Sequence, residues 1–294
     1  MTKAVIFGYG NVGRAVADTL AQTPDIELAG IVSAGGAGGK FGGLTIVGTA
    51  GELPPYDVAI LARPSREVPG LAEKLLAQGV CTVDSFDIHS EIPAVRKKLG
   101  AVAQKHGKAA VISAGWDPGS DSVLRALFET MAPRGITYTN FGPGMSMGHS
   151  VAVRAIEGVR EALSLTIPAG TGIHRRMVYV ELLDGYTLAD VAARIKADEY
   201  FVHDDTHVSA VESVAALRDM GHGVLIERKG GSGGVNNQLF TFDMRIDNPA
   251  LTAQVMVASA RAAVRQVPGC YTMIEIAPVD FLPMSRDEAV AKLV

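Results

Sequence analysis

The sequence predicts an α/β protein: a Rossmann-type, doubly wound parallel sheet joined to an α+β domain with a mostly antiparallel sheet. Three observations predict it. Short apolar runs alternate with amphipathic helical patterns over the first third of the chain, which is typical of parallel strands covered by helices on both faces. A glycine-rich turn lies between the first apolar run and the first helical pattern. Beyond about residue 115 this alternation gives way to alternating or β-branched strand patterns.

The predicted strands of the first domain are short and apolar. Helical patterns separate them, and the first of these ends before Pro24 because proline cannot continue a helix. The helical faces after the third and fourth strands fall near residues 68–76 and 96–106. The strands cover residues 4–7, 28–32, 58–61, 80–83 and 109–113.

The second part of the chain predicts a different architecture. A loop at residues 115–119 precedes a predicted helix over residues 120–131, and the strand-like runs that follow cover residues 162–167, 177–183, 223–228 and 238–246. A helix over residues 251–266 and an apolar run over 271–276 are expected to return to the first domain. We therefore expect a dinucleotide-binding domain over residues 1–117, completed by about 265–294, and a substrate-binding and dimerisation domain over 118–264.

The bulk composition excludes several classes of protein. A chain of 294 residues accommodates two or three packed units, and 48% hydrophobic with 20% charged residues is ordinary for a globular enzyme. The net charge of -4, without a dense run of Lys or Arg, argues against a nucleic-acid partner. No apolar run approaches the roughly 18 residues of a membrane span.

The start of the chain and its cysteines indicate a cytoplasmic protein. Residues 1–3 run straight into a strand pattern, so we expect no secretory signal. Cys81 and Cys270 are the two cysteines, and Cys81 lies in a predicted strand, where a buried, inert thiol is expected. A reducing compartment follows. We predict no metal site.

The first candidate site is the glycine turn. Gly8, Gly10 and Gly13 lie between a strand and a helix, the context that a dinucleotide-binding motif requires. In such motifs the first glycine permits the tight turn, the second lets the backbone approach the pyrophosphate, and the third lets helix and strand pack closely. The free N–H groups of the helix N-terminus then face the phosphates. An ordinary strand-to-helix turn is the alternative that this context disfavours.

The choice of nicotinamide cofactor rests on the end of the second strand. An acidic residue there, about 20 residues after the motif, would bind the ribose of NAD. The chain has Ser33-Ala34-Gly35 instead, with neither an acid nor an arginine. The Ser33 hydroxyl, glycine N–H groups and Lys40 suit a phosphate, and Arg63 suits adenine or the same phosphate, or is a simple surface arginine. The pattern favours NADP and leaves NAD open.

The second candidate site consists of carboxylates at the carboxyl ends of strands, where ligands of parallel sheets bind. Asp84 and Asp87 follow the strand at 80–83, and Asp117 follows the strand at 109–113. Carboxylates in this place suit a cationic amine, although each aspartate is also a normal helix cap or turn residue. Arg176 directly precedes the run at 177–183 and suits a carboxylate ligand, although an arginine at a strand end is more often solvated.

Four sequence blocks resemble the signature blocks of the meso-diaminopimelate dehydrogenase family. Their order and spacing hold, and the similarity runs from end to end. The blocks at 113–119 and 141–150, which contain Gly-Trp-Asp-Pro-Gly and Gly-Pro-Gly-Met-Ser-Met-Gly-His-Ser, are far more specific than the glycine turn. The four blocks cover residues 4–14, 81–87, 113–119 and 141–150.

The resemblance implies a homodimer with a small-molecule substrate. It also implies reversible, NADP-linked oxidation of the D-configured centre of meso-2,6-diaminopimelate. The products are L-2-amino-6-oxopimelate, which cyclises to tetrahydrodipicolinate, and ammonia. This reaction belongs to lysine biosynthesis.

The resemblance further implies which residues form the site. Asp87 and Asp117 are the catalytic candidates, because they would contact the substrate near the nicotinamide and take or relay its proton; the base is not assigned to either one. Pocket residues around the reacting end are Phe141, Met147 and Gly148. The L-configured end is held by Thr166, Arg176, His222 and Asn248. The cofactor-binding set is Gly8, Tyr9, Gly10, Asn11, Val12, Gly13, Ser33, Ala34, Gly35, Arg63, Ser85, Phe86, Asp87, Trp116, Asp117, Pro118, Gly119, Ser120 and Asp121.

Two departures and two rival interpretations accompany the resemblance. Phe141 stands where the family commonly has tryptophan, and Ala34-Gly35 replace a basic pair, which bears on the preference for NADP. A different amino-acid-pathway dehydrogenase or reductase, such as a dihydrodipicolinate or homoserine enzyme or one acting on D-amino acids, would share the glycine turn but not the blocks at 115–119 and 141–150. A nicotinamide-sensing regulator would need a basic DNA-reading helix, and the sequence shows none.

Overall fold

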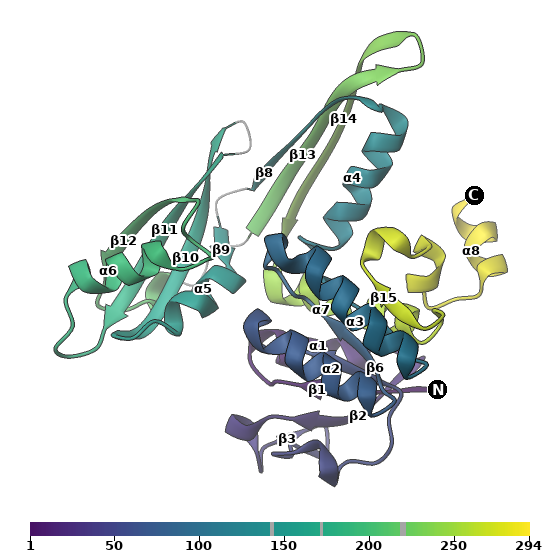
Figure 1. Cartoon of the computed structure of the whole chain (residues 1–294), viewed down its shortest axis with the longest axis horizontal. Coiled ribbons are helices and arrows are strands. Elements are labelled where there is room, and N and C mark those ends of the chain that lie inside the picture. The colour runs from purple at the N-terminus through teal and green to yellow at the C-terminus, as the bar shows by residue number, and fades with distance from the viewer. Residues whose placement is uncertain (142–143, 171–172, 218–221) are drawn as a thin grey trace. The chain divides into compact units, whose positions relative to one another are not determined.

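The computed structural model describes residues 1–141, 144–170, 173–217 and 222–294 (Figure 1). Contacts between residues divide the chain into two compact units. Unit 1 combines Met1–Leu124 with Pro249–Val294, and unit 2 is Arg125–Asn248. Within the described residues, no helix combines the length and the apolar character of a membrane-spanning segment.

Unit 1 is built on a six-stranded sheet in the order β15-β7-β6-β5-β1-β2. All of its strand pairs are parallel, which confirms the predicted doubly wound sheet. The strand order reverses at β1, which has β2 on one side and β5 on the other, and ligands of such sheets bind outside the carboxyl ends at this switch point. The strands are β1 (Thr2–Phe7), β2 (Ile26–Val32), β5 (Val58–Leu61), β6 (Cys81–Asp84), β7 (Ala109–Val111) and β15 (Gly269–Tyr271).

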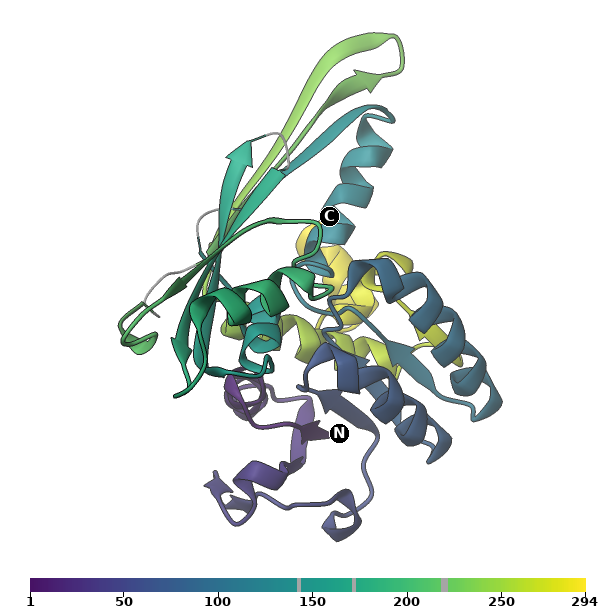
Figure 2. The same cartoon turned by 60° about the vertical axis from the view of Figure 1, so that its left-hand side comes forward.

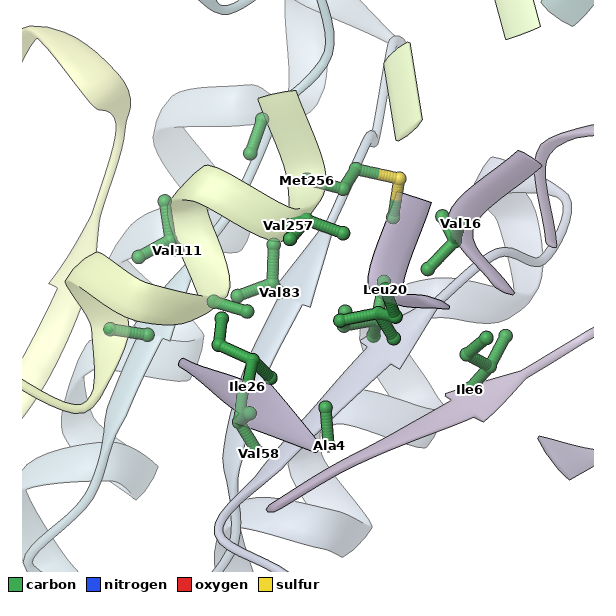
Figure 3. Packing of buried hydrophobic residues seen from close by; sticks show 14 of the residues in the cluster. Ala4, Ile6, Val16, Leu20, Ile26, Val58, Val83, Val111, Met256 and Val257 are labelled. Atoms are coloured by element: carbon green, nitrogen blue, oxygen red, sulfur yellow. The ribbon is translucent and has the colours of Figure 1, made fainter. Parts of the chain in front are cut away.

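Both faces of this sheet are buried, because successive side chains of each strand point to opposite faces. Ala4 and Ile6 of β1 belong to one apolar cluster, whereas Val5 and Phe7 belong to the other. Helices α1 (Asn11–Ala21) and α7 (Asn248–Ala263) cover the first face, and Figure 3 shows their side chains against the strands. Helices α2 (Val68–Ala77) and α3 (Ile92–Lys105) cover the second. A fully apolar strand therefore suits a sheet with two covers.

The C-terminal part of unit 1 begins with α7. This helix packs its alanine, valine and methionine side chains into the sheet core, so the contacts place the end of unit 2 at Asn248. The boundary expected near residue 264 lies at the other end of the same helix. Strand β15 then adds the sixth strand beside β7, and α8 (Arg286–Leu293) follows. The short strands β3 (Lys40–Phe41) and β4 (Leu44–Thr45) form a separate antiparallel pair.

Unit 2 contains a three-stranded sheet in the order β14-β13-β8 and a four-stranded sheet in the order β12-β11-β10-β9 (Figure 2). The pairs are antiparallel except β11 with β12, which confirms the mostly antiparallel second sheet. Its strands are β8 (Arg134–Phe141), β9 (Gly144–Ser146), β10 (Val159–Gly170), β11 (Ile173–Leu182), β12 (Asp205–Ala210), β13 (His222–Ser232) and β14 (Val235–Ile246). Its helices are α4 (Ser120–Met131), which begins in unit 1, α5 (Met147–Arg154) and α6 (Leu188–Ala197).

Helix α4 packs on one face of the three-stranded sheet. The ring of Phe128 stacks on Phe240 at 5.7 Å between centroids. Arg228 is only 1% exposed, and its Nε donates to the carbonyl of Ala132 at 2.8 Å while Nη1 pairs with Glu129. A buried guanidinium is tolerated because its hydrogen bonds replace those lost from water. The opposite face of this sheet carries no helix of unit 2 in Figure 1.

Candidate active site

The glycine turn at the carboxyl end of β1 has the close packing that the motif predicts. Gly8 has φ +105°, a conformation that favours glycine. A Cβ on Gly13 would lie 2.1 Å from the carbonyl oxygen of Gly8, so helix and strand touch there. A Cβ on Gly10, in contrast, would meet no protein atom within 4 Å. Gly8 and Gly13 are therefore required by the fold, while Gly10 leaves its surroundings clear.

The N-terminus of α1 is suited to an anion. Helix α1 begins at Asn11, and no side chain caps it. Asn11 and Val12 therefore present first-turn N–H groups at the positive end of the helix dipole. Tyr9 is held beside this turn, with the guanidinium of Arg14 5.6 Å from its ring centroid and the ring of Phe41 at 6.5 Å. This arrangement fits the pyrophosphate of a dinucleotide.

The segment after β2 supplies hydroxyl and backbone groups, but no charge, at the predicted ribose position. Ser33 uses its N–H to bond the carbonyl of Val47 at 2.9 Å, and the exposed Ala34 and Gly35 start a short 3-10 turn. Arg63, after β5, pairs its guanidinium with Glu67, with Nε 3.0 Å from the carboxylate. Its Cδ would lie 3.1 Å from a Cβ built on Gly8. The stem of Arg63 thus lies against the glycine turn.

Asp87 is held at the carboxyl end of the sheet by a residue that the sequence did not single out. The hydroxyl of Ser65, from the turn after β5, donates to Oδ1 of Asp87 at 2.7 Å. The N–H of Asp87 lies 3.3 Å from the same hydroxyl. The serine of an Arg-Pro-Ser sequence after a strand is a weak signal, because such turns are common.

The loop that carries Asp117 is closed on itself by glycines. The N–H of Gly115 donates to the carbonyl of Pro118 at 3.2 Å, and a Cβ on Gly119 would lie 1.8 Å from the carbonyl oxygen of Gly115. A Cβ on Gly115 would lie 3.6 Å from the Cβ of Ser85. The segments that carry Asp87 and Asp117 are therefore neighbours in unit 1, as their strand ends predicted.

The remaining predicted cofactor residues in this region differ in exposure. Phe86 is 1% exposed and belongs to the sheet core, so its backbone is what a cofactor would reach. Trp116 and Asp121 are also buried, and Ser120 begins α4. Their side chains shape the loop from within. Asp117 is half-buried and Pro118 is buried.

Asp84 connects the two carboxylate-bearing segments. Its side chain is fully buried, and Oδ1 accepts hydrogen bonds from the N–H of Phe86 at 3.0 Å and of Ser113 at 3.2 Å. Its carbonyl accepts from the N–H of Ala114 at 2.7 Å. Burial raises the pKa of Asp84 to about 6, against the opposing effect of the two N–H groups. Asp84 thus fixes the backbone that precedes both Asp87 and Asp117.

The raised pKa of Asp84 predicts a pH-dependent stability. The folded pKa of about 6 exceeds the ordinary value of 3.8, so folding disfavours the ionised form, and this group destabilises the fold increasingly as pH rises from about 4 to about 6. The variant Asp84→Asn lacks this effect. Between pH 5 and pH 7.5 its free energy of unfolding should therefore rise relative to the wild type by about 1 kcal/mol.

Urea unfolding of both proteins across this pH range measures the difference. Asp57→Asn, at an exposed aspartate of the same unit that bonds the N–H of Lys3, is the control. A difference between Asp84→Asn and wild type that stays constant with pH would contradict the prediction.

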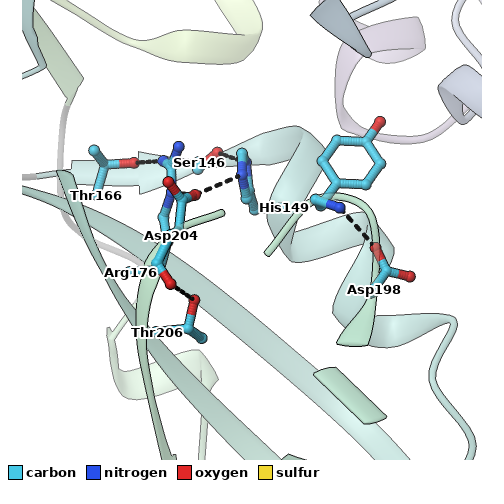
Figure 4. Close-up of polar contacts among 8 residues, drawn as sticks. Ser146, His149, Thr166, Arg176, Asp198, Asp204 and Thr206 are labelled. Atoms are coloured by element: carbon cyan, nitrogen blue, oxygen red, sulfur yellow. Dashed lines mark hydrogen bonds and ion pairs between the residues drawn. The ribbon is translucent and has the colours of Figure 1, made fainter. Parts of the chain in front are cut away.

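In unit 2, two of the predicted substrate residues lie side by side. Thr166 on β10 and Arg176 on β11 are cross-strand partners, and Nη1 of Arg176 donates to the hydroxyl of Thr166 (Figure 4). Thr166 is 1% exposed and the Arg176 side chain 13%. The hydroxyl therefore holds one end of a nearly buried guanidinium.

Arg176 has a second partner that sequence reasoning missed. Its Nε donates to Oδ2 of Asp204 at 2.6 Å, and Nε2 of His149 lies 3.7 Å from the same oxygen. The other ring nitrogen of His149 is 2.8 Å from the hydroxyl of Ser146. Figure 4 shows this chain of contacts from the start of α5 to β11. His149 lies in the block at 141–150, but Asp204 had no sequence signal, because the contact depends on the pairing of β11 with β12.

Asp204 is charged at neutral pH. Burial raises the pKa of Asp204, but hydrogen bonds from His149 and Arg176 outweigh burial and hold the pKa of this carboxyl below its usual value. Arg176 and Asp204 therefore place a positive and a negative group next to each other in a partly desolvated place.

The other predicted substrate residues of unit 2 form further contacts. The ring of Phe141, at the end of β8, lies 4.8 Å from His174 and 6.3 Å from His222 between centroids. Nδ1 of His222 accepts from the N–H of Gly223 at 2.8 Å. His174 was not singled out from the sequence. Phe141 thus lies among imidazole rings.

Met147 and Gly148 form the first turn of α5, and Nδ2 of Asn248 donates to the carbonyl of Met145 at 3.4 Å. These contacts bring Asn248 to the strand that precedes α5. The Gly142-Pro143 part of the 141–150 block and the residues just before His222 lie outside the described residues.

Comparisons with known proteins identify the family of this chain. The family profile of the diaminopimelic acid dehydrogenase C-terminal domain matches residues 115–175. Meso-diaminopimelate D-dehydrogenase of Bacteroides fragilis is 59% identical to this chain, with 99% of each chain covered. A structure of the C. glutamicum DAP dehydrogenase in complex with DAP superposes with a TM-score of 0.87 at 30% identity, covering 100% of this chain and 99% of the other.

A second solved structure extends the comparison to the cofactor. It is an engineered D-amino acid dehydrogenase bound to NADP+, with a TM-score of 0.86 and 30% identity over 100% of this chain and 99% of the other. Sequence identity of this extent over the full length is shared by proteins with one evolutionary origin and one fold. The chain belongs to the meso-diaminopimelate D-dehydrogenase family.

Proposed function

We propose that this protein oxidises the D-centre of meso-2,6-diaminopimelate with NADP+ to an imine, which water hydrolyses to L-2-amino-6-oxopimelate and ammonia, as a step of lysine biosynthesis. The proposal rests on the 59% sequence identity with the Bacteroides fragilis dehydrogenase, which extends over 99% of each chain. It also favours this activity over the dihydrodipicolinate, homoserine and regulator interpretations. The glycine turn, the carboxylates Asp87 and Asp117 and the Arg176 site would each have a role in this reaction.

Unit 1 fits a dinucleotide. The clear space beside Gly10 and the uncapped N-terminus of α1 suit the pyrophosphate. The Ser33 hydroxyl with the exposed backbone of Ala34 and Gly35 would hold the ribose phosphate of NADP, where an acidic residue would repel it. When bound, NADP accepts a hydride from the D-centre carbon.

Asp87 and Asp117 would act on the reacting amine. Their negative charges attract the ammonium, and one of them takes a proton from it, directly or through water, because only the neutral amine has the lone pair that assists hydride loss. The hydroxyl of Ser65 donates to Oδ1 of Asp87 and so orients this carboxylate. The closed loop at 115–119 gives Asp117 a fixed backbone. We propose these two carboxylates as the catalytic residues.

Unit 2 would hold the L-configured end of the substrate. Arg176, oriented by Thr166, would bind the distal carboxylate, with His222 and Asn248 as further hydrogen-bonding partners. Phe141, Met147 and Gly148 would line the pocket. We further propose that residues 118–264 serve substrate binding and dimerisation, with 1–117 and about 265–294 serving the dinucleotide.

One assay tests the activity. Purified protein is given NADP or NAD, and the absorbance of the reduced cofactor is followed after adding meso-diaminopimelate, with the LL isomer as the control. We expect reduction of NADP with the meso compound and none with the LL isomer, which has no D-centre. No reduction of either cofactor, or equal rates with both isomers, would overturn the proposal.

We also propose a cytoplasmic homodimer that uses the open face of the three-stranded sheet in unit 2. On that face Ile136 of β8 and Leu239 of β14 flank Lys229, and they are 60% and 61% exposed. Tyr138 lies two residues further along β8 and is 38% exposed. Apolar side chains in one row on a sheet face are typical of an interface.

Charged substitutions on this face should separate the two copies. In the double variant Ile136→Glu/Leu239→Glu, each interface of a twofold dimer receives four carboxylates, because the same patch contributes from both copies. We expect a dimer-to-monomer shift at micromolar concentration, measured by sedimentation velocity. Val202→Glu, at a residue of unit 2 that is 53% exposed elsewhere, should leave the wild-type mass unchanged. A double variant with the same mass as the wild type would exclude this surface.

A further inference from the structure

The two partners of the Arg176–Asp204 ion pair are only partly engaged. An arginine carries five N–H groups; those of Arg176 donate once to Thr166 and once to Asp204. The other N–H groups, on Nη1 and Nη2, have no partner in the part of the chain that the structure describes. Asp204 receives both Arg176 and His149 on Oδ2, and its Oδ1 has no partner among the described residues.

This arrangement is complementary to the head of an α-amino acid. Such a head carries a carboxylate and an ammonium on one carbon. The terminal nitrogens of Arg176 suit the carboxylate bidentately, and the remaining oxygen of Asp204 suits the ammonium. The side chains of Arg176 and Asp204 are 13% and 22% exposed, so a ligand reaches them while the surrounding protein reduces screening by water.

We propose that Asp204 is a specificity-determining residue, whose Oδ1 accepts a hydrogen bond from the ammonium of the L-configured head while Arg176 binds its carboxylate. The inference rests on the proposed function, in which unit 2 holds that head. It adds a negative partner to a set of residues that otherwise recognises the carboxylate. A diacid that lacks the distal ammonium would then bind poorly, because Asp204 would face it without a donor.

The neighbouring ion pair shows why Asp204 differs from a surface carboxylate. Arg175 and Asp205 are the sequence neighbours of Arg176 and Asp204. They pair at 2.7 Å, but their side chains are 49% and 50% exposed. The second carboxylate oxygen of Asp205, Oδ1, contacts Nε2 of His207 at 2.9 Å. The chain therefore supplies a matched control next to the proposed residue.

The test compares two seven-carbon ligands that differ by one ammonium group: L-2-aminopimelate and pimelate. Their dissociation constants are measured by isothermal titration calorimetry on full-length protein with NADP present. For wild type we expect L-2-aminopimelate to bind at least about tenfold more tightly than pimelate, the value of one charge-assisted hydrogen bond. In Asp204→Asn, which keeps the shape and an acceptor for Arg176, this preference should fall to about onefold. Asp205→Asn should keep the wild-type preference.

The possible outcomes are distinct. If Asp204→Asn weakens the binding of both ligands equally, Asp204 only orients Arg176, and the proposal is overturned. The proposal is also overturned if the wild type binds neither ligand or binds both with the same affinity. Should Asp204→Asn not fold, Asp204→Ser offers a smaller acceptor and the same expected loss. Turnover of meso-diaminopimelate by wild type is recorded separately. If Asp204→Asn loses the preference but the wild type does not turn over meso-diaminopimelate, the result counts against the proposed function alone. If the wild type turns over meso-diaminopimelate but Asp204→Asn keeps the preference, the result counts against the role of Asp204 alone.

Discussion

Replacing Gly13 with alanine is expected to destabilise unit 1 by about 3 kcal/mol or more, because the new methyl group has no room. Its carbon would lie 2.1 Å from the carbonyl oxygen of Gly8. That oxygen belongs to backbone in a turn with φ +105° that is tied by the N–H of Gly8 to Val32. The clash is therefore relieved only by separating α1 from β1, which exposes Val16 and Leu20 of the core.

Gly10→Ala is the matched control in the same motif. No protein atom lies within 4 Å of a Cβ at that position, so its stability should stay within about 1 kcal/mol of the wild type. The methyl group of the new alanine would instead fill the space beside the turn in which the pyrophosphate is proposed to bind. We expect the dissociation constant for NADP to rise at least about tenfold, since a close backbone approach is lost.

Urea unfolding and NADP titration on both variants give four numbers that must fall in this pattern. Gly13→Ala should lose stability, and Gly10→Ala should lose cofactor affinity with its stability intact. Two variants that are equally stable and bind NADP as tightly as the wild type would show that the turn does not bind the dinucleotide.

Arg176→Ala is expected to raise the KM for meso-diaminopimelate about a hundredfold, with a smaller change in kcat. Removing the guanidinium takes away the partner of the distal carboxylate and leaves Asp204 without the charge that balances it. Losing one side of a partly buried charge pair costs about 2–5 kcal/mol, and a hundredfold change corresponds to about 2.7 kcal/mol. Asp87 and Asp117, which we propose to act on the reacting centre, are unchanged in this variant.

Steady-state kinetics of Arg176→Ala and Arg175→Ala test this expectation. Arg175 is adjacent in sequence and half exposed, so its loss should leave KM within about twofold of wild type, as for exposed ion pairs. Equal kinetics for all three proteins would remove Arg176 from the substrate site. The dimer mass and the affinity for NADP of Arg176→Ala should match the wild type, which separates lost binding from lost folding.

The arrangement of unit 1 could be predicted from the sequence because its information is local. A strand such as Val58–Leu61 is wholly apolar because both faces of the sheet are covered, and the glycine motif is read within six residues. Unit 2 was harder. The parallel partner β12 and the edge strand β8 were not predicted, because Asp205–Ala210 and Arg134–Phe141 mix polar and apolar residues and depend on neighbours that are distant in sequence.

The sequence by itself determined the parallel sheet and the family, and it predicted the glycine turn and the carboxylates Asp87 and Asp117 at the ends of strands. Each depends on residues whose spacing is short or whose pattern is specific. Only the tertiary structure decided the partners: Ser65 for Asp87, the buried Asp84 behind both segments, and Asp204 for Arg176. These contacts join residues on or next to different strands, 22, 29 and 28 positions apart. No local pattern encodes them, because strand pairing alone sets which side chains meet.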